Sequence, residues 1–444
     1  MCISLLKGNR KYMAILHKLK KISIITKRYY YPFASRISDG SYHYIKSNCL
    51  PIDKWEDERP QLKEYISTIF DGSSVAIFAA ARMGFYAILK SLNLPSQSEV
   101  ILTGFTCSVM VNAVIRAGYR PVYADVDANT MGSSPKEIEK KITALTKVVV
   151  AQHSFGIPCK IDEIKQLCTD RGLFLIEDCA IAFLSTYKGV KLGLWGDAAI
   201  FSLDRTKPVN TFIGGYVITK QESLYKKLVE IEEDAKELPI ELQKKILKRL
   251  CVEYAYFSPS KYPVYRVLKS CKNIIYKILG MKVEYVSLNK DSSSIPSLDN
   301  VVYPYPAKYP KALSHICMLE IQSYIQNIDN VKRRTGKILH ALANMGISLP
   351  LAYLDSANDI LPLRIVFVLE NNRKRAFFSQ FYEEDSYWYK HPIVNTKEKL
   401  ENFGYQMGEC PKAEQIGTNI VNVSILNLSD ADVERMFGKY LNLI

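Results

Sequence analysis

Features that define several other protein classes are missing from this 444-residue sequence. No apolar run reaches the roughly 18 residues that a membrane-spanning helix requires. The ten cysteines are scattered, with no CxxC pair and no His/Cys cluster, so neither a zinc site nor a redox dithiol is predicted. Unpatterned cysteines in a large chain are typical of a reduced, cytoplasmic protein. No GxGxxG follows an apolar strand, which argues against a dinucleotide-binding dehydrogenase.

The length and the charge leave several partner classes open. A single hydrophobic core stops growing at roughly 250–300 residues, so two domains are expected. The chain has 59 Lys and Arg against 45 Asp and Glu, a net charge of +14. A surplus of this sign favours anionic partners, which include phosphorylated metabolites, nucleic acid and anionic membrane surfaces. Composition does not choose among them.

The first 60 residues form a basic N-terminal arm. Residues 1–33 interleave Lys and Arg with apolar residues, without the apolar centre and small-residue cleavage site of a signal peptide. Two interpretations stay open. The arm is either an amphipathic helix in peripheral contact with a membrane or a segment that packs on a neighbouring subunit or stays mobile. The second is favoured.

Strand-like and helical segments alternate from about residue 74. Short apolar, β-branched runs of the kind found in strands buried on both faces are 99–103, 121–125, 147–152, 173–177, 198–202 and 215–219. Helices are predicted between them over 108–118, 133–145 and 159–172. Gly118 and Gly172 are plausible helix ends. This alternation predicts an α/β fold with a large, mostly parallel sheet covered by helices.

The pattern changes after Thr219. Residues 221–290 are predicted to be a charged helical insert, and 290–311 an irregular Ser/Pro-rich connector. Residues 312–345 are predicted to form one long amphipathic helix. A smaller α/β part follows, with a strand within 361–370 and a capped helix over 429–441. The expected division is an arm at 1–60, a large domain at 61–290, and a linker, long helix and small domain at 291–444.

Three side chains that could take part in catalysis or ligand binding lie at or after the ends of two predicted strands. Asp178 follows the strand 173–177, Ser202 ends the next strand, and Lys207 comes five residues later. Ligands bind at the carboxyl ends of strands in open parallel sheets. Taken singly, these residues are more often a turn aspartate, a capping serine and a solvated lysine. Together they match the needs of pyridoxal phosphate (PLP): an amine for its aldehyde, an acid for its ring nitrogen and a hydroxyl for its phosphate.

Five segments in order resemble the DegT/DnrJ/EryC1/StrS family of PLP-dependent sugar aminotransferases. They are AAARMGFYAILKSLNLPSQSEVILTGFTC, GYRPVYADVDANT, ITALTKVVVAQHSFGIPCKIDEI, and the pair FLIEDCAIAF and GDAAIFSLDRTKPVNTFIGGYVIT. They span about residues 74–220, and WYKHP and VNVSILNLSDADVERM resemble later family segments. The resemblance implies the type I PLP-transferase fold, with a smaller C-terminal α/β domain.

The resemblance also implies roles for individual residues. Lys207 would form the Schiff base with PLP and move the proton during transamination. Asp178 would pair with the pyridinium nitrogen. Ser202 would hold the phosphate, with backbone N–H groups of Arg82 and Met83. Cys107 stands where many members stack an aromatic ring on the cofactor, and whether Phe105 substitutes for that ring is open.

The chain departs from the family pattern at several positions. Ile181 stands where members have Gln or His, and Ala81 replaces the first glycine of the phosphate loop. The GxNxR segment has no clear counterpart. His153 and His391 are candidates for the substrate pocket, although a buried structural role is favoured for both. Neither is placed among the catalytic residues, and no metal site is assigned.

These observations predict an aminotransferase that moves an amino group from an amino acid, glutamate in the family, to a keto-sugar carried on a nucleotide, for amino-sugar or surface polysaccharide synthesis. The resemblance implies a homodimer. The alternative is a degenerate homologue that binds PLP or a sugar nucleotide in a regulatory or scaffold role. A nucleic-acid or membrane-surface protein built on this fold is a third interpretation. The sequence has no recognition helix, zinc finger or aromatic RNA-binding strand, so no nucleic-acid partner is predicted.

Overall fold

The structure is a computed structural model. It describes residues 35–48, 51–279, 304–370, 377–378, 389–396, 398–425 and 428–441. Most of the predicted basic arm, the end of the 221–290 insert and the start of the connector lie outside these residues. Within the described part, none of the helices combines the length and apolarity needed to cross a membrane.

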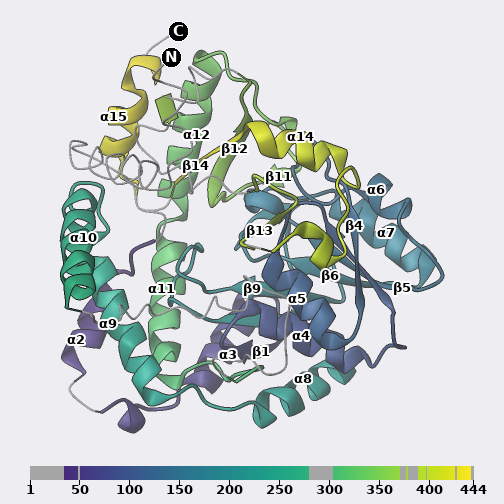
Figure 1. The fold of residues 1–444 in the computed structure, drawn as a ribbon, viewed down its shortest axis with the longest axis horizontal. Helices are drawn as coiled ribbons and strands as arrows, with labels where there is room; N and C mark the ends of the chain where they lie inside the picture. Colours follow the sequence, from purple (N-terminus) through teal and green to yellow (C-terminus); the bar gives the residue numbers. More distant parts are fainter. Residues whose placement is uncertain are drawn as a thin grey trace.

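A seven-stranded sheet forms the centre of the molecule (Figure 1). Its strands lie in the order β1-β10-β9-β6-β5-β2-β4. Only β10 runs antiparallel to its two neighbours, and the other pairs are parallel. The bounds are β1 Ser74–Phe78, β2 Glu99–Thr103, β4 Arg120–Ala124, β5 Thr146–Gln152, β6 Phe174–Asp178, β9 Ala198–Ser202 and β10 Gly215–Thr219. The six predicted strands are thus confirmed within one residue, and β1 was not among them.

Helices cover both faces of this sheet. Successive side chains of a strand point to opposite faces of the sheet. In β10, two neighbouring residues, Tyr216 and Val217, show which helices cover each face. The ring of Tyr216 stacks on Phe201 at 4.8 Å and lies near Phe70, which ends α3 (Arg59–Ile69). Its neighbour Val217 faces α4 (Ala81–Leu92), where its methyl group lies 2.8 Å from the position of a Cβ on Gly84. Strands enclosed in this way are apolar throughout, as their sequences predicted.

The connecting helices end where the sequence predicted, with one exception. α5 (Ser108–Ala117) and α7 (Ile161–Arg171) are followed by Gly118 and Gly172 in the left-handed conformation, with φ of 90° and 61°. The helix predicted over 133–145 begins correctly, because the Ser134 side chain accepts from the Glu137 N–H, but α6 spans only Pro135–Glu139. The residues after it form a turn leading into β5.

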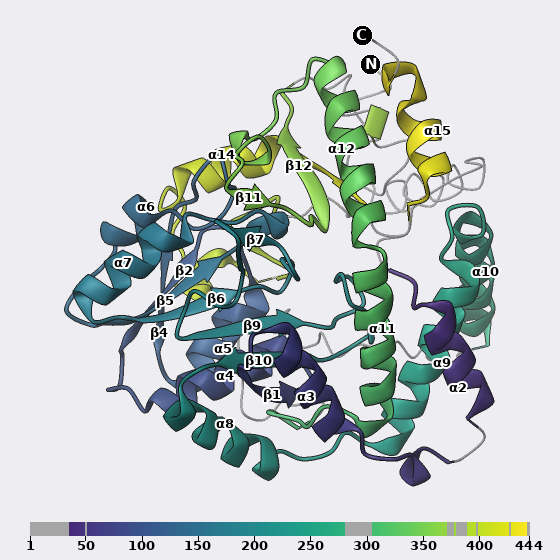
Figure 2. The same cartoon turned by 180° about the vertical axis from the view of Figure 1, so that it is seen from behind.

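The region after β10 is helical, as predicted. It contains α8 (Glu222–Asp234), α9 (Ile240–Tyr256) and α10 (Tyr262–Ile278). α8 packs on β1 and α4, whereas α9 packs on α2 (Asp39–Ser47). α10 stands at the rim of the molecule, on the far side from α7 (Figures 1 and 2).

The prediction of a single long helix over 312–345 is wrong. Two helices, α11 (Ser314–Gln326) and α12 (Ile328–Asn344), follow one another along nearly one line (Figure 2). They are separated at Asn327, whose backbone is not helical and whose side chain donates to the Ser323 carbonyl at 2.8 Å. Asparagine competes for backbone groups in this way and favours helix ends.

A second hydrophobic core lies around α12. It includes β12 (Arg364–Val368), paired antiparallel with β14 (Ile420–Ser424), and α15 (Asp430–Leu441). The predicted cap of α15 is confirmed as a capping box, since Ser429 and Asp432 each accept from the other's N–H. The remaining elements of this half include β11 (Asn358–Asp359), β13 (Ile393–Val394) and α14 (Pro411–Asn419). The domain bounds at 60 and 290 stay predictions.

Candidate active site

Asp178 is the last residue of β6 and lies at the carboxyl end of the parallel part of the sheet. Its side chain is buried, and Oδ1 accepts a hydrogen bond from the Ala180 N–H at 3.0 Å. Burial raises the pKa of this carboxyl group, and the Ala180 N–H and the charge of Lys207 oppose that rise. A carboxylate in such a position is stabilised by a positively charged partner placed against it.

Lys207 lies in the loop between β9 and β10. Asp204 shapes this loop, because its Oδ1 accepts from both the N–H and the hydroxyl of Thr206 and its carbonyl accepts from the Lys207 N–H at 2.9 Å. Burial lowers the pKa of the Lys207 amine, against the opposing effect of Asp204, Cys107 and Asp178. A lowered pKa increases the neutral, nucleophilic fraction of the amine near neutral pH.

Ser35 and Asn210 hold the same loop from outside. The Ser35 N–H donates to the Arg205 carbonyl at 3.1 Å, and its hydroxyl is 3.4 Å from the Lys207 carbonyl. Asn210 Nδ2 donates to the Ser35 carbonyl at 2.8 Å. These contacts fix the backbone of the loop that carries the lysine.

The backbone of β10 opposite Ser202 comes close to the start of α4. In the β9–β10 pair, Ser202 lies opposite Gly215. A Cβ on Gly215 would lie 2.3 Å from the Ala81 nitrogen and 2.7 Å from the Phe201 carbonyl, so only glycine fits there. Gly214 has φ of 123°, a second reason for a glycine pair.

The start of α4 has the properties of an anion site. None of the described side chains caps this helix at Ala80, and the backbone N–H groups of its first turn carry partial positive charge. The predicted phosphate contacts, Arg82 and Met83, are its second and third residues. The Met83 N–H already donates to the Ala80 carbonyl at 3.0 Å. Ser202 thus lies opposite the glycine that approaches this helix start, and its hydroxyl accepts from the Asp204 N–H at 3.4 Å; the phosphate contacts of Ser202, Arg82 and Met83 stay predictions.

Cys107 and Phe105 have different environments. Cys107 is partly exposed, interacts electrostatically with Lys207, and its Sγ accepts from Asn395 Nδ2 at 3.2 Å. Phe105 is fully buried and its ring stacks on Tyr389 at 5.4 Å. Whether Phe105 substitutes for the cofactor-stacking ring stays open.

Two further side chains, Tyr389 and Arg364, join the site from the C-terminal half. The Tyr389 phenol is buried, and burial together with the charge of Asp178 raises its pKa. Arg364 on β12 is fully buried, donates from Nη1 to Asn422 Oδ1 at 2.9 Å, and its positive charge contributes to the lowered pKa of Lys207. Neither residue was predicted from the sequence. The WYKHP segment pointed to this region, but it directed attention to His391, which is exposed rather than buried.

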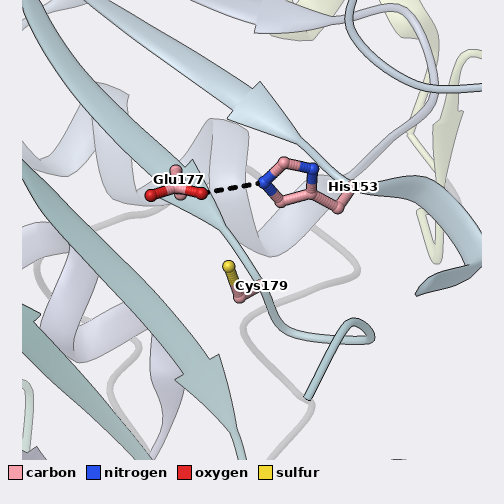
Figure 3. Close-up of side chains that lie close together, drawn as sticks. All are labelled: His153, Glu177 and Cys179. Carbon is pink, nitrogen blue, oxygen red and sulfur yellow. Dashed lines mark hydrogen bonds and ion pairs between the residues drawn. The ribbon is translucent and has the colours of Figure 1, made fainter. Parts of the chain in front are cut away.

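The fold groups a histidine, a glutamate and a cysteine that lie apart in the sequence. Strands β5 and β6 bring His153, Glu177 and Cys179 together, and all three are buried (Figure 3). His153 Nε2 lies 3.1 Å from Glu177 Oε2, and His153 Nδ1 accepts from the Cys159 N–H at 3.2 Å. The Cys159 N–H donating to Nδ1 assigns the ring proton to Nε2, which faces Glu177. Burial acts to lower the pKa of His153, but Cys159, Cys179 and Glu177 outweigh it and raise that pKa.

Both carboxylate oxygens of Glu177 already accept hydrogen bonds. Besides His153, it accepts from the backbone N–H groups of Gly193, Trp195 and Gly196 at 2.7–2.9 Å. The backbone N–H of His153 donates to the backbone carbonyl of Asp178 at 3.2 Å. His153 is thus buried and hydrogen-bonded, as was favoured from the sequence, and its structural role stays a prediction. Ile181 is also buried and offers no polar atom to a ligand.

Comparison with known proteins shows which family this part of the chain resembles. Residues 64–244 match the model of the DegT/DnrJ/EryC1/StrS aminotransferase family. The resemblance predicted from the sequence is therefore confirmed. The matched segment contains every predicted site residue.

Particular relatives agree with this class. The chain is 36% identical over 184 residues to a GDP-perosamine synthase from Escherichia coli O157:H7, covering 41% of this chain and 48% of the relative. The chain thus spans about half the length of the curated relatives that it matches.

Solved structures extend the likeness to nearly the whole chain. An aminotransferase from Psychrobacter cryohalolentis superposes with a TM-score of 0.66 at 17% identity, covering 93% of this chain and 98% of its own. The PLP form of a putative sugar aminotransferase from Streptococcus pneumoniae gives a TM-score of 0.64 at 17% identity over 93% and 98%. The chain has the fold of these proteins, the type I PLP-transferase fold predicted from its sequence.

Proposed function

We propose that this protein is a PLP-dependent aminotransferase that moves an amino group from an amino acid, glutamate first among the candidates, to a keto-sugar carried on a nucleotide. One observation carries the proposal. Lys207, with its lowered amine pKa, and the buried Asp178 lie at the ends of neighbouring strands, beside a helix start without a side-chain cap. The GDP-perosamine synthase relative supports the sugar-nucleotide class.

The donor set fits PLP. The close approach of Gly215 to Ala81 leaves no room for a side chain where Ser202 and the first turn of α4 would hold the phosphate. Asp178 would accept the ring N–H, and the resulting ion pair would offset the cost of burying its carboxylate. When bound, PLP supplies an aldehyde that receives the amino group and a ring that accepts negative charge.

Lys207 performs the proton transfers. Because burial lowers the pKa of its amine, Lys207 Nζ is able to take up a proton near neutral pH and return it to another atom of the substrate. The hydrogen bonds from Ser35 and Asp204 to its loop keep the amine in place. Asp178 stays ionised against the ring N–H and keeps that nitrogen protonated.

Arg364 is proposed to receive a carboxylate of the amino-acid donor. Its guanidinium is buried, and its charge acts on Lys207. A carboxylate bound there would be neutralised at short range in a site shielded from water, where charge-assisted hydrogen bonds are strongest. Its bond to Asn422 holds the guanidinium in orientation.

A second candidate function is a homologue that binds PLP or a sugar nucleotide without turnover. The apolar Ile181 and the engagement of the Met83 N–H with Ala80 favour it. In either case we propose a homodimer, on the family resemblance alone.

The cofactor assignment is tested by adding PLP to the purified protein, reducing with borohydride and locating the modified lysine by mass spectrometry. The proposal predicts a stoichiometric label on Lys207. The matched control is Lys188→Ala, which removes an exposed lysine paired with Asp162 and should label normally. A label spread over surface lysines would overturn the proposal. A label on Lys207 without subsequent reaction with glutamate would favour the second candidate.

A further inference from the structure

Helix α10 presents an exposed stripe of apolar side chains. Val264, Leu268, Ile275 and Ile278 are 56%, 55%, 53% and 77% exposed, and Cys271 lies exposed between them. Their spacing of four and three residues places them on one face of the helix. Ile274 and Leu279 widen the stripe with 59% and 63% exposure. Contiguous apolar surface of this kind marks an interaction site.

The opposite face of α10 is already used for packing. Tyr262 is buried against Phe257, with ring centroids 5.0 Å apart, and Tyr265 packs on the same ring at 5.3 Å. Arg249 on α9 donates from Nη1 to the Tyr265 hydroxyl at 2.6 Å. The helix is therefore fixed to the body of the protein with its apolar stripe turned outward, at the rim of the molecule (Figure 2).

The charge of α10 has one sign. From Lys261 to Leu279 the sequence contains five basic residues and neither Asp nor Glu. The basic residues are Lys261, Arg266, Lys269, Lys272 and Lys277. A basic helix with an apolar face is the combination that binds at the surface of a membrane with anionic lipids.

We propose that the α10 stripe docks on an anionic lipid surface and holds the protein there as a peripheral membrane protein. A second copy of the chain fits less well, since a two-fold contact through α10 would bring two acid-free basic helices together. Residues 1–34 fit less well for the same reason, because they contain eight Lys and Arg and no acid. The inference does not depend on the proposed transamination.

The test is cosedimentation of the full chain with vesicles of phosphatidylcholine alone or with added phosphatidylglycerol. The wild type should bind the anionic vesicles and lose binding as salt is raised. The double variant Leu268→Asp/Ile275→Asp should bind at least about tenfold more weakly, equal to about 1.4 kcal/mol. Lys261→Gln/Lys272→Gln should reduce the salt dependence, because it removes two charges from the contact.

The matched control is Leu351→Asp/Leu354→Asp, which changes two leucines that are 62% and 76% exposed away from α10. It should bind within about twofold of the wild type, which is under 0.5 kcal/mol. Equal binding by wild type and the α10 variant would overturn the proposal, as would absence of binding to anionic vesicles. Light scattering supplies a further readout, because loss of oligomers in the α10 variant with unchanged vesicle binding would assign the stripe to a second copy and overturn it as well.

Discussion

Arg205 Nη2 donates to Oε1 of Glu253 at 2.6 Å, which ties the loop of Lys207 to helix α9. The Glu253 side chain is 1% exposed and also accepts from Arg249 Nε at 2.7 Å. Arg205 precedes Lys207 by two residues. The helical insert after β10 is thus connected to the candidate active site through a buried carboxylate shared by two guanidinium groups.

Replacing Glu253 with Ala should loosen this loop. Two partly buried guanidinium hydrogen bonds to a buried carboxylate are lost, so the free energy of unfolding should fall by about 2–3 kcal/mol, and the affinity for PLP should fall with it. Urea unfolding and a PLP titration measure the two effects. Glu241→Ala is the control on the same helix, because its carboxylate is 75% exposed and pairs with Lys244 at the surface. It should leave the free energy of unfolding nearly unchanged. Equal effects of both variants would contradict the coupling.

Replacing Asp178 with Asn should separate stability from function. The buried carboxylate costs free energy when no cation faces it, so the PLP-free variant should be more stable near neutral pH by about 1 kcal/mol. Transamination should fall by at least about a thousandfold, since a neutral amide does not keep the ring nitrogen protonated. Thermal unfolding and a single-turnover assay measure the two changes.

The pH dependence of stability gives a check on Asp178. Burial raises the pKa of this group in the folded protein, so the folded state binds more protons than the unfolded state between the two pKa values. Its contribution is therefore present below the unfolded pKa and is lost as pH rises through the folded pKa. The Asp178→Asn variant should lose this component of the decline. An unchanged profile would show that Asp178 is not desolvated.

Replacing Gly215 with Ala should close the approach between β10 and α4. The added methyl group would meet the Ala81 nitrogen at 2.3 Å, so backbone must move and the affinity for PLP should fall at least about tenfold, or about 1.4 kcal/mol. Gly336→Ala is the control, because a Cβ at this position in α12 meets nothing within 4 Å. It should leave PLP binding unchanged and stabilise the helix by about 0.5–1 kcal/mol. Normal PLP binding by Gly215→Ala would exclude a phosphate site here.

Replacing Arg364 with Lys keeps the buried charge and removes the planar guanidinium. If this group receives the donor carboxylate, KM for glutamate should rise about tenfold, with kcat and PLP binding nearly unchanged. Steady-state kinetics with varied glutamate separates these parameters. A fall in kcat at constant KM would mean that Arg364 acts only on the pKa of Lys207.

The central sheet was predictable because its strands are short apolar runs that end in turns or helix starts. Asp178, Ser202 and Lys207 could be found for the same reason, since each lies at or after such a run. Arg364 and Tyr389 could not, because they reach the site from more than 150 residues away. No local pattern marks Arg364, and the WYKHP segment that contains Tyr389 drew attention to His391 instead. The break at Asn327 was hidden by apolar periodicity that continues through α11 and α12. The grouping of His153 with Glu177 depends on the pairing of β5 with β6, which spacing along the chain does not reveal.

The most direct test of the account is a single turnover of PLP-loaded protein with glutamate, with 2-oxoglutarate measured against the concentration of sites. The account predicts one equivalent of 2-oxoglutarate per site in the wild type and none in Lys207→Ala. Release of no 2-oxoglutarate by wild type that carries PLP on Lys207 would contradict transamination from glutamate. Equal release by the Lys207→Ala variant would contradict the assignment of the catalytic lysine.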